Sequence, residues 1–269
     1  MGVSETYSKR KKITGNELDR NLTESSALKA YTLKELKILF RTPAFLMNCV
    51  IMNFLWPVFI LIPVFTQPNM LKDINKLSGF INDEKVLAIV LIVGFAISLF
   101  VSSTNGITAT SISREGQNIF VNKYIPMRYK DQIMAKVLAG VILSGFGILL
   151  IIVMAAAFIK PALSFVVMLA LVALIGVVFS GFLGIFIDLS NPKLDWDNEQ
   201  RAVKNNLNLV INMLLNIVIA VASSVILIKL HLSLLNAFVV LVIVFGTLNI
   251  ILYKLLITQG EKLFNKIES

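Results

Sequence analysis

The sequence predicts an all-α, polytopic integral membrane protein, on the evidence of its composition, its long apolar runs and the placement of its basic residues. Of the 269 residues, 57% are hydrophobic and 15% are charged, whereas soluble domains have about 45 to 50% apolar residues. A bilayer core of about 30 Å needs about 20 apolar residues in a helix, and lipid-exposed backbone must satisfy its own hydrogen bonds. Apolar runs of that length are therefore expected to be membrane-spanning helices.

Six runs reach this length, and we expect them to form a transmembrane domain over residues 44–258. The predicted spans are 44–65, 86–110, 137–158, 162–187, 207–228 and 236–257. A basic tail, 1–24, and an amphipathic helix, 25–43, precede them, and a second tail, 259–269, follows. No apolar signal-peptide core occurs in the first 40 residues, so the first span is expected to act as its own insertion signal.

The segment ALKAYTLKELKILFRTP before the first span has the pattern of an amphipathic helix in the membrane interface. Leu28, Tyr31 or Thr32, Leu36 and Leu39 recur near helical spacing, with lysines and Glu35 between them. The run Arg41-Thr42-Pro43 should end this helix, because the residue before a proline disfavours helix. A solvated helix without lipid contact is the alternative.

Basic residues predict the orientation of the chain. The N-terminal segment, the second and fourth loops and the C-terminal tail hold 20 of the 25 Lys and Arg residues. Since Lys and Arg concentrate on the cytoplasmic side, both termini are expected to be cytoplasmic. The net charge of +9 is then explained by topology and by attraction to anionic lipid, and nucleic acid is not an expected partner.

The single cysteine, Cys49, allows no internal disulfide.

Small and polar residues form faces on several predicted spans. Gly94, Ser98, Ser102 and Gly106 fall at every fourth position, and Thr110 continues the series. Such a face permits close helix packing, and lining of a translocation path is the alternative. Gly176, Ser180 and Gly184 repeat the pattern in the fourth span.

An asparagine stripe marks the fifth span. Asn208, Asn212 and Asn216 follow Asn205 at helical spacing, and such side chains bond across helices in membranes. Structural bonding, or a seam with a second copy, is the favoured interpretation. Polar lining of a substrate route is the alternative.

The sequence disfavours several chemistries. No predicted span carries Asp, Glu, His or Arg at its centre, which argues against a proton-driven transporter. We predict no catalytic residues and no metal ligands, because the only histidine is His231 and no buried serine has a candidate base. No G-x-x-x-x-G-K-[ST] loop is present, so no cofactor is expected in this chain and any ATP hydrolysis should belong to a partner.

The polar segment SISREGQNIFVNKYIPMRYKDQIMAK, 111–136, separates the second and third spans. Ile119, Phe120 and Tyr124 recur at roughly helical spacing, and Pro126 follows them. A short helix with an apolar face is therefore expected here, suited to a groove in a soluble partner. The alternative is a solvated connector whose positive charges only enforce topology.

These residues carry a family resemblance. A span ending in small polar residues, then R-E-G at 114–116, a short helix, Pro126 and Lys136 opening the third span resemble the permease subunits of type-2 ABC exporters. The elbow at 41–43 agrees with that pattern. The segment NPKLDWDNEQRAVK, 191–204, resembles the fourth loop of a bacterial branch whose members are about twice as long, so the chain is similar to a C-terminal half.

The resemblance implies a permease in a bacterial plasma membrane, coupled to an ATPase subunit that binds ATP and Mg. Coupling residues would be Arg114, Glu115, Gly116, Ile119, Phe120, Tyr124 and Pro126. Ile119, Phe120 and Tyr124 would dock, and Arg114 and Glu115 would fix the helix end. The 188–206 segment, with Asp188, Asp195, Trp196, Asp197 and Glu199, would make a second, weaker contact. A second permease half, or a second copy, would complete the pore. The rival hypothesis is a non-transporting scaffold or immunity-type protein that binds other membrane chains.

Overall fold

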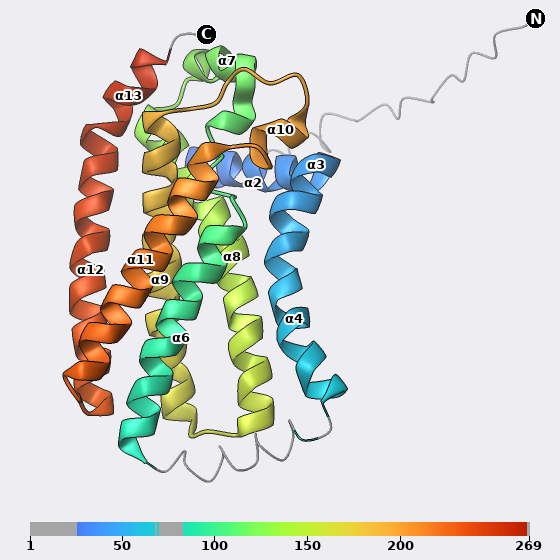
Figure 1. Ribbon diagram of the computed structural model, residues 1–269. Coiled ribbons are helices and arrows are strands. Elements are labelled where there is room, and N and C mark those ends of the chain that lie inside the picture. Colours follow the sequence, from blue (N-terminus) through green and yellow to red (C-terminus); the bar gives the residue numbers. More distant parts are fainter. Residues whose placement is uncertain (1–25, 68, 70–82, 268–269) are drawn as a thin grey trace, which may run out of the picture.

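The computed structural model describes residues 26–67, 69 and 83–267, which form a bundle of long helices (Figure 1). Among these residues, six helices are long and apolar enough to cross a membrane. The predicted fold class is therefore confirmed. The predicted tail 1–24 and most of the loop between the first two spans lie outside the described residues.

A helix followed by a turn occupies the predicted elbow before the first span. Helix α2 spans Ala27–Arg41, capped by the Ser26 hydroxyl, and Thr42 is extended before the chain turns into α3, Pro43–Phe45. The π-helical turn η1, Leu46–Ile51, leads into α4, Met52–Thr66. Pro57 and Pro63 lie inside α4, where each removes a backbone hydrogen bond and favours a kink. The end of α4 diverges from its neighbours in Figure 1.

The remaining long helices make up the rest of the bundle. They are α6, Glu84–Thr104; α8, Tyr129–Ile159; α9, Leu163–Ser190; α11, Leu207–Lys229; and α12, Leu234–Thr258. Helix α8 begins at Tyr129 rather than at the predicted 137, and so carries its polar residues Gln132 and Lys136 as part of a continuous helix. Short helices connect or extend these elements: η2, Ser113–Asn118; α7, Ile119–Tyr124; α10, Glu199–Val203; and α13, Gly260–Lys266.

The predicted end of the second span is wrong. Helix α6 ends at Thr104 instead of residue 110, because the Asn105 side chain accepts a hydrogen bond from the Ile107 amide and Gly106 has φ +66°. Asn-Gly pairs favour turns in this way. Gly94, Ser98 and Ser102 therefore share α6, whereas Gly106 and Thr110 lie beyond it.

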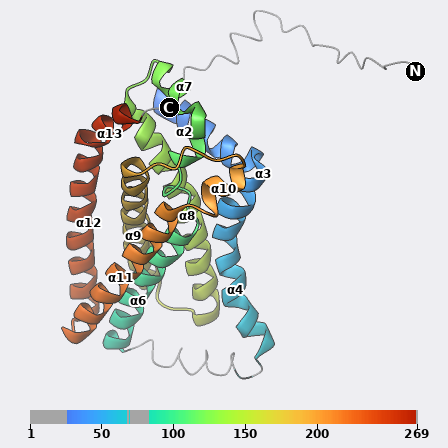
Figure 2. The same cartoon turned by 45° about the horizontal axis from the view of Figure 1, so that its top comes forward.

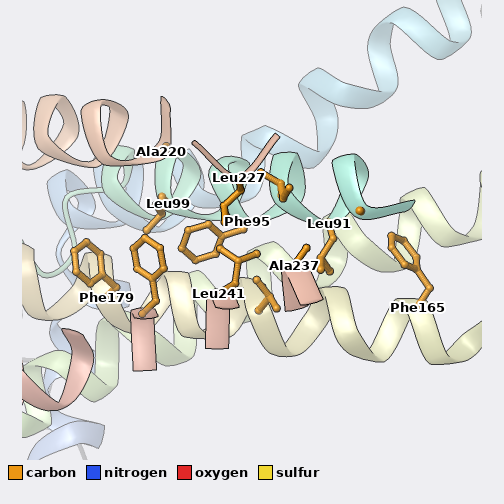
Figure 3. Packing of buried hydrophobic residues seen from close by; sticks show 13 residues of the cluster. Leu91, Phe95, Leu99, Phe165, Phe179, Ala220, Leu227, Ala237 and Leu241 are labelled. Carbon is orange, nitrogen blue, oxygen red and sulfur yellow. The ribbon is translucent and has the colours of Figure 1, made fainter. Parts of the chain in front are cut away.

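Apolar packing holds the long helices together. Leu91, Phe95 and Leu99 of α6 meet side chains of α9, α11 and α12 in one buried cluster, including Phe179, Ala220 and Leu241 (Figure 3). Phe95 also packs against Phe245, with ring centroids 4.4 Å apart. The small residues of two spans meet, as predicted for helix packing: the Ser98 hydroxyl lies directly against Gly176 of α9.

The two ends of the bundle differ. Figures 1 and 2 place α2, α7, α10 and α13 together at one end, which we call the loop end. The other end, where α8 turns into α9 through residues 160–162, we call the opposite end. Helix α2 packs across α8 at the loop end and buries Tyr31, Thr32, Glu35 and Leu39. The polar side chains of this end are therefore brought together inside the molecule.

We predict that Gly176→Ala destabilises the fold by about 1 to 3 kcal/mol, since overpacking a tight contact costs that much. The new methyl group would lie against Ser98 and 3.1 Å from a Phe95 ring carbon. Gly246→Ala is the matched control, because no side chain lies within 4 Å of that position on α12, and alanine favours helix by about 1 kcal/mol. Thermal unfolding in detergent measures both variants. Equal effects would contradict the packing account.

Candidate functional site

A buried lysine joins three segments at the loop end. Lys136 of α8 has a side chain only 1% exposed, and its ammonium donates to Glu35 of α2 at 2.8 Å, to the carboxylate of Glu115 in η2 and to the Ser111 carbonyl at 3.2 Å. A buried charge is tolerated only when it is paired and hydrogen-bonded. We call Lys136, Glu35, Glu115, Tyr31 and Asn122 the lysine cluster.

Neutral side chains complete this cluster. The Tyr31 hydroxyl donates to Asn122 Oδ1 at 3.1 Å, and Gln132 of α8 donates to the carbonyls of Asn122 and Met127 at 3.1 and 3.0 Å. Burial raises the pKa of the Tyr31 phenol above its usual value, only partly offset by the Lys136 charge. Tyr31 therefore remains a neutral donor. Helix α2 is thus tied to α7 through Asn122, and α7 and the turn that follows it are tied to α8 through Gln132.

The charge on Glu115 is maintained by its neighbour. Burial alone would raise the pKa of the Glu115 carboxyl, but the adjacent Lys136 ammonium, with a smaller contribution from Lys34, holds that pKa below its usual range. A carboxyl with a depressed folded-state pKa stabilises the fold above its unfolded pKa, and this stabilisation is lost as pH falls through the folded pKa. The ion pair is therefore intact at neutral pH.

A buried aspartate makes a second set of hydrogen bonds to the segment between α6 and α8. Asp188 of α9 is fully buried, and its carboxylate accepts from the amides of Ile112 and Ser113 at 2.6 and 3.0 Å, from the Ser113 hydroxyl, and from Asn208 of α11 at 2.9 Å. Asn208 also donates to the Asn191 carbonyl at 2.7 Å. We call Asp188, Ser113 and Asn208 the aspartate cluster. It connects α9, α11 and the chain leading into η2.

Arg114 and Gly116 fix the turn between the two clusters. The Arg114 guanidinium is buried, donates to the Ile107 carbonyl at 2.7 Å and lies 5.6 Å from the Phe45 ring centroid. Gly116 has φ +54° and ψ −140°, a conformation available only to glycine. Trp196 packs on that glycine, and its indole N–H donates to the Ser113 carbonyl at 2.8 Å.

The predicted docking residues separate into buried and exposed ones. Ile119 is fully buried in a cluster with Ile133 and Phe264, so the prediction that it docks on a partner is wrong. Phe120 and Tyr124 are 45% and 83% exposed, and Val121 between them is also exposed. We call these three side chains the α7 patch. Pro126 is exposed in the turn after α7.

Arg114 and Glu115 do not lie at a partner surface, contrary to the sequence prediction. They bond within the chain, because the turn before α7 folds into the bundle end. Of the predicted second contact, Asp195 and Glu199 are exposed and Trp196 is half-buried. Asp188 belongs to the interior instead.

The asparagine stripe is internal. Asn208, Asn212 and Asn216 are buried on α11, and Asn216 donates to the Asn212 backbone carbonyl at 2.9 Å and to its side chain at 3.0 Å. Asn205, by contrast, is exposed. This arrangement agrees with structural bonding within one chain.

The sequence interpretation missed Glu35 and Lys136 as a pair. The sequence did contain a sign of the burial of Glu35. Tyr31, Glu35 and Leu39 are spaced four residues apart and so share one helix face, on which Glu35 lies between an aromatic and an apolar residue. It also missed Asn105, which donates to Ser144 at 2.8 Å and to Asn53 at 3.3 Å. Within the described residues, no group of three or more His, Cys, Asp or Glu side chains could hold a metal ion.

Comparison with known proteins identifies a family for this chain. The sequence model of a family described as "Membrane protein of 12 TMs" matches residues 1–258. No curated protein and no solved structure gives a significant match.

We predict that Lys136→Met destabilises the protein by about 3 to 5 kcal/mol, because it removes the buried counter-ion of Glu35 and of the partly buried Glu115, leaving Glu35 only the more distant Lys34 at 3.8 Å. Thermal unfolding in detergent measures the loss, and adding Glu35→Gln and Glu115→Gln should restore part of it. Lys130→Met, at a half-buried lysine of the same helix, is the control and should have little effect. A Lys136→Met protein as stable as the control would refute the role assigned to the ion pair.

Proposed function

We propose that this chain, which belongs to that family of membrane proteins with twelve transmembrane segments, is a permease half of an exporter powered by a separate ATP-binding-cassette subunit. The α7 patch, exposed on a short helix that is bonded into the bundle end, carries the proposal. A soluble partner would bind Phe120, Val121 and Tyr124. The sequence resemblance to type-2 ABC exporter permeases supports the same assignment.

Force applied to α7 would reach several membrane helices. Glu115 precedes α7 and pairs with Lys136 of α8 and, through it, with Glu35 of α2. Ser113 is held by Asp188 of α9, which also binds Asn208 of α11. A movement of the ATPase on binding ATP would therefore shift α2, α8 and α9 together with the loop. Coupling requires two states of the permease that make different contacts with the partner.

The proposal assigns ATP and Mg to the partner subunit and gives this chain a purely mechanical role. The ATPase would take the α7 patch as its main contact and the exposed Asp195 and Glu199 as a weaker second one. Apolar and aromatic side chains of a short helix are suited to a groove in a partner. Carboxylates at the rim of such a contact contribute mainly to orientation and association rate.

A second half completes the proposed transporter. The described residues contain six candidate membrane spans, whereas the family description gives twelve. A second copy of this six-span unit, or a different six-span unit, would supply the other six. The transported substrate would cross between the halves in this scheme, since the asparagines and the Ser98–Gly176 contact lie inside one half.

We predict that Phe120→Asp and Tyr124→Asp each weaken binding of the ATPase about tenfold or more, as expected for loss of an aromatic anchor. Co-purification with ATP-binding-cassette subunits of the same genome measures binding, and ATPase stimulation in lipid measures coupling. Gln117→Asp is the matched control, because it adds the same charge at an exposed position outside the patch. Unchanged co-purification and ATPase stimulation in both patch variants would reject the docking role.

The proposal also requires the loop end to face the cytoplasm. In a Cys49→Ala background, which has no other cysteine, Tyr124→Cys and Leu163→Cys place one exposed thiol at each end of the bundle. We expect an impermeant maleimide to label Leu163→Cys in intact cells and Tyr124→Cys only after permeabilisation. Labelling of Tyr124→Cys in intact cells would overturn the orientation.

A further inference from the structure

Two adjoining hollows form a crevice between α6 and α8 in the half of the bundle near the opposite end. The hollow nearer that end has a volume of about 140 Å³, and the next has about 260 Å³. Both are lined by Val90 of α6, Ile152 and Ala155 of α8, and Leu169 of α9. The two hollows thus adjoin each other along shared walls, and we call them together the α6–α8 crevice. Figure 1 shows α6 and α8 flanking α9 there.

The α6–α8 crevice is suited to hydrocarbon. Its lining side chains are aliphatic or aromatic throughout. An apolar space of this kind offers no partners to an ordered water, and an empty space would forfeit the dispersion contacts of its walls. The crevice lies between two candidate membrane-spanning helices. The apolar molecule available to fill it is therefore a lipid acyl chain from the bilayer.

The length of the crevice matches one lipid leaflet. Its lining on α6 runs from Val86 to Ile97, which at about 1.5 Å per residue is roughly 16 Å. The hydrocarbon core of a bilayer is about 30 Å thick, so each leaflet occupies about half of it. Toward the centre of the bundle, Trp56 packs on the cluster that contains the lining residues Ile148 and Ile152. A single acyl chain therefore fits from the surface to the membrane centre.

Two lysines flank the end of the crevice that lies nearest the opposite end of the bundle. Lys85 precedes the lining residue Val86, and Lys160 lies between Ile159 and Pro161, which also line the crevice. Both lysines are exposed. Lys160 ends α8 in the left-handed conformation, with φ 52°. The nearby Asp83 carboxylate is engaged by the Lys85 amide at the start of α6, while Glu84 is exposed. Lysine ammoniums at a membrane surface are suited to bind a phosphate.

We propose that the α6–α8 crevice binds one phospholipid, with an acyl chain between α6 and α8 and its phosphate at Lys85 and Lys160. Two features together indicate a phospholipid: the length of the crevice matches one acyl chain, and the lysines at one end match a phosphate. An apolar peptide segment carries no phosphate for these lysines to bind. The site is separate from the loop end and does not require the ATPase. A bound lipid would hold α6 and α8 apart at a fixed distance near the opposite end.

Native mass spectrometry of the detergent-purified chain with added phosphatidylglycerol tests the site. Ala155→Phe fills the crevice and should lower retention of a single lipid about tenfold, a loss of one decade in affinity. Ala157→Phe is the matched control, since Ala157 is exposed on the same helix but does not line the crevice. It should retain the lipid as the native chain does.

A second pair of variants tests the headgroup contact independently of packing. Lys85→Gln combined with Lys160→Gln should weaken retention severalfold, whereas Lys229→Gln, exposed at the same end on α11, should not. These surface changes leave the core intact, so they decide the matter even if Ala155→Phe unfolds. Equal lipid retention by the native chain, a folded Ala155→Phe and the lysine pair would overturn the proposal. So would an equal loss in the Ala157→Phe or Lys229→Gln controls.

Discussion

The ion pair at Lys136 determines how the loop end of this protein is organised. Its ammonium is removed from water and contacts two carboxylates, one from α2 and one from η2. Neither carboxylate nor the lysine could remain buried alone, since an unpaired internal charge costs several kcal/mol. The three segments are therefore mutually dependent, and the interfacial helix, the loop and α8 form one unit.

The aspartate cluster extends the same constraint to the other half of the bundle. Asp188 accepts hydrogen bonds from the backbone of the loop and from Asn208, so α9 and α11 hold the same segment whose Ser111 carbonyl is bonded to Lys136. Trp196 then covers the turn at Gly116. The segment between α6 and α8 is thus packed and hydrogen-bonded into the bundle. Its exposed α7 patch is presented on a support held by buried hydrogen bonds, which would reduce the ordering cost of binding the proposed ATPase.

Local patterns predicted the spans and the elbow, because apolar length and the Thr42-Pro43 pair act within a few residues. The end of α6 was missed, since Asn105 and Gly106 interrupt a helix inside a continuing run of small, uncharged residues. Ile119 was misassigned because a six-residue helix is too short to show which face is buried. The Glu35–Lys136 pair joins residues 101 positions apart, and sequence alone gives no register between such segments. The sequence therefore predicted which segments form the candidate site. It did not predict which of their residues are buried in the bundle and which are exposed.

The contrast between the two ends of the bundle limits where a conformational change can occur. At the loop end, α2, α8, α9 and α11 are joined by buried charged and polar bonds whose rupture is costly. At the opposite end, α6 and α8 face each other across an apolar crevice, and α4, which contains two prolines, diverges from both. Apolar contacts are non-directional, so helices there can separate or approach and repack with little loss of specific bonding. A push on the rigid loop end would therefore be expressed as movement at the opposite end, and a phospholipid in the crevice would oppose closure of α6 on α8.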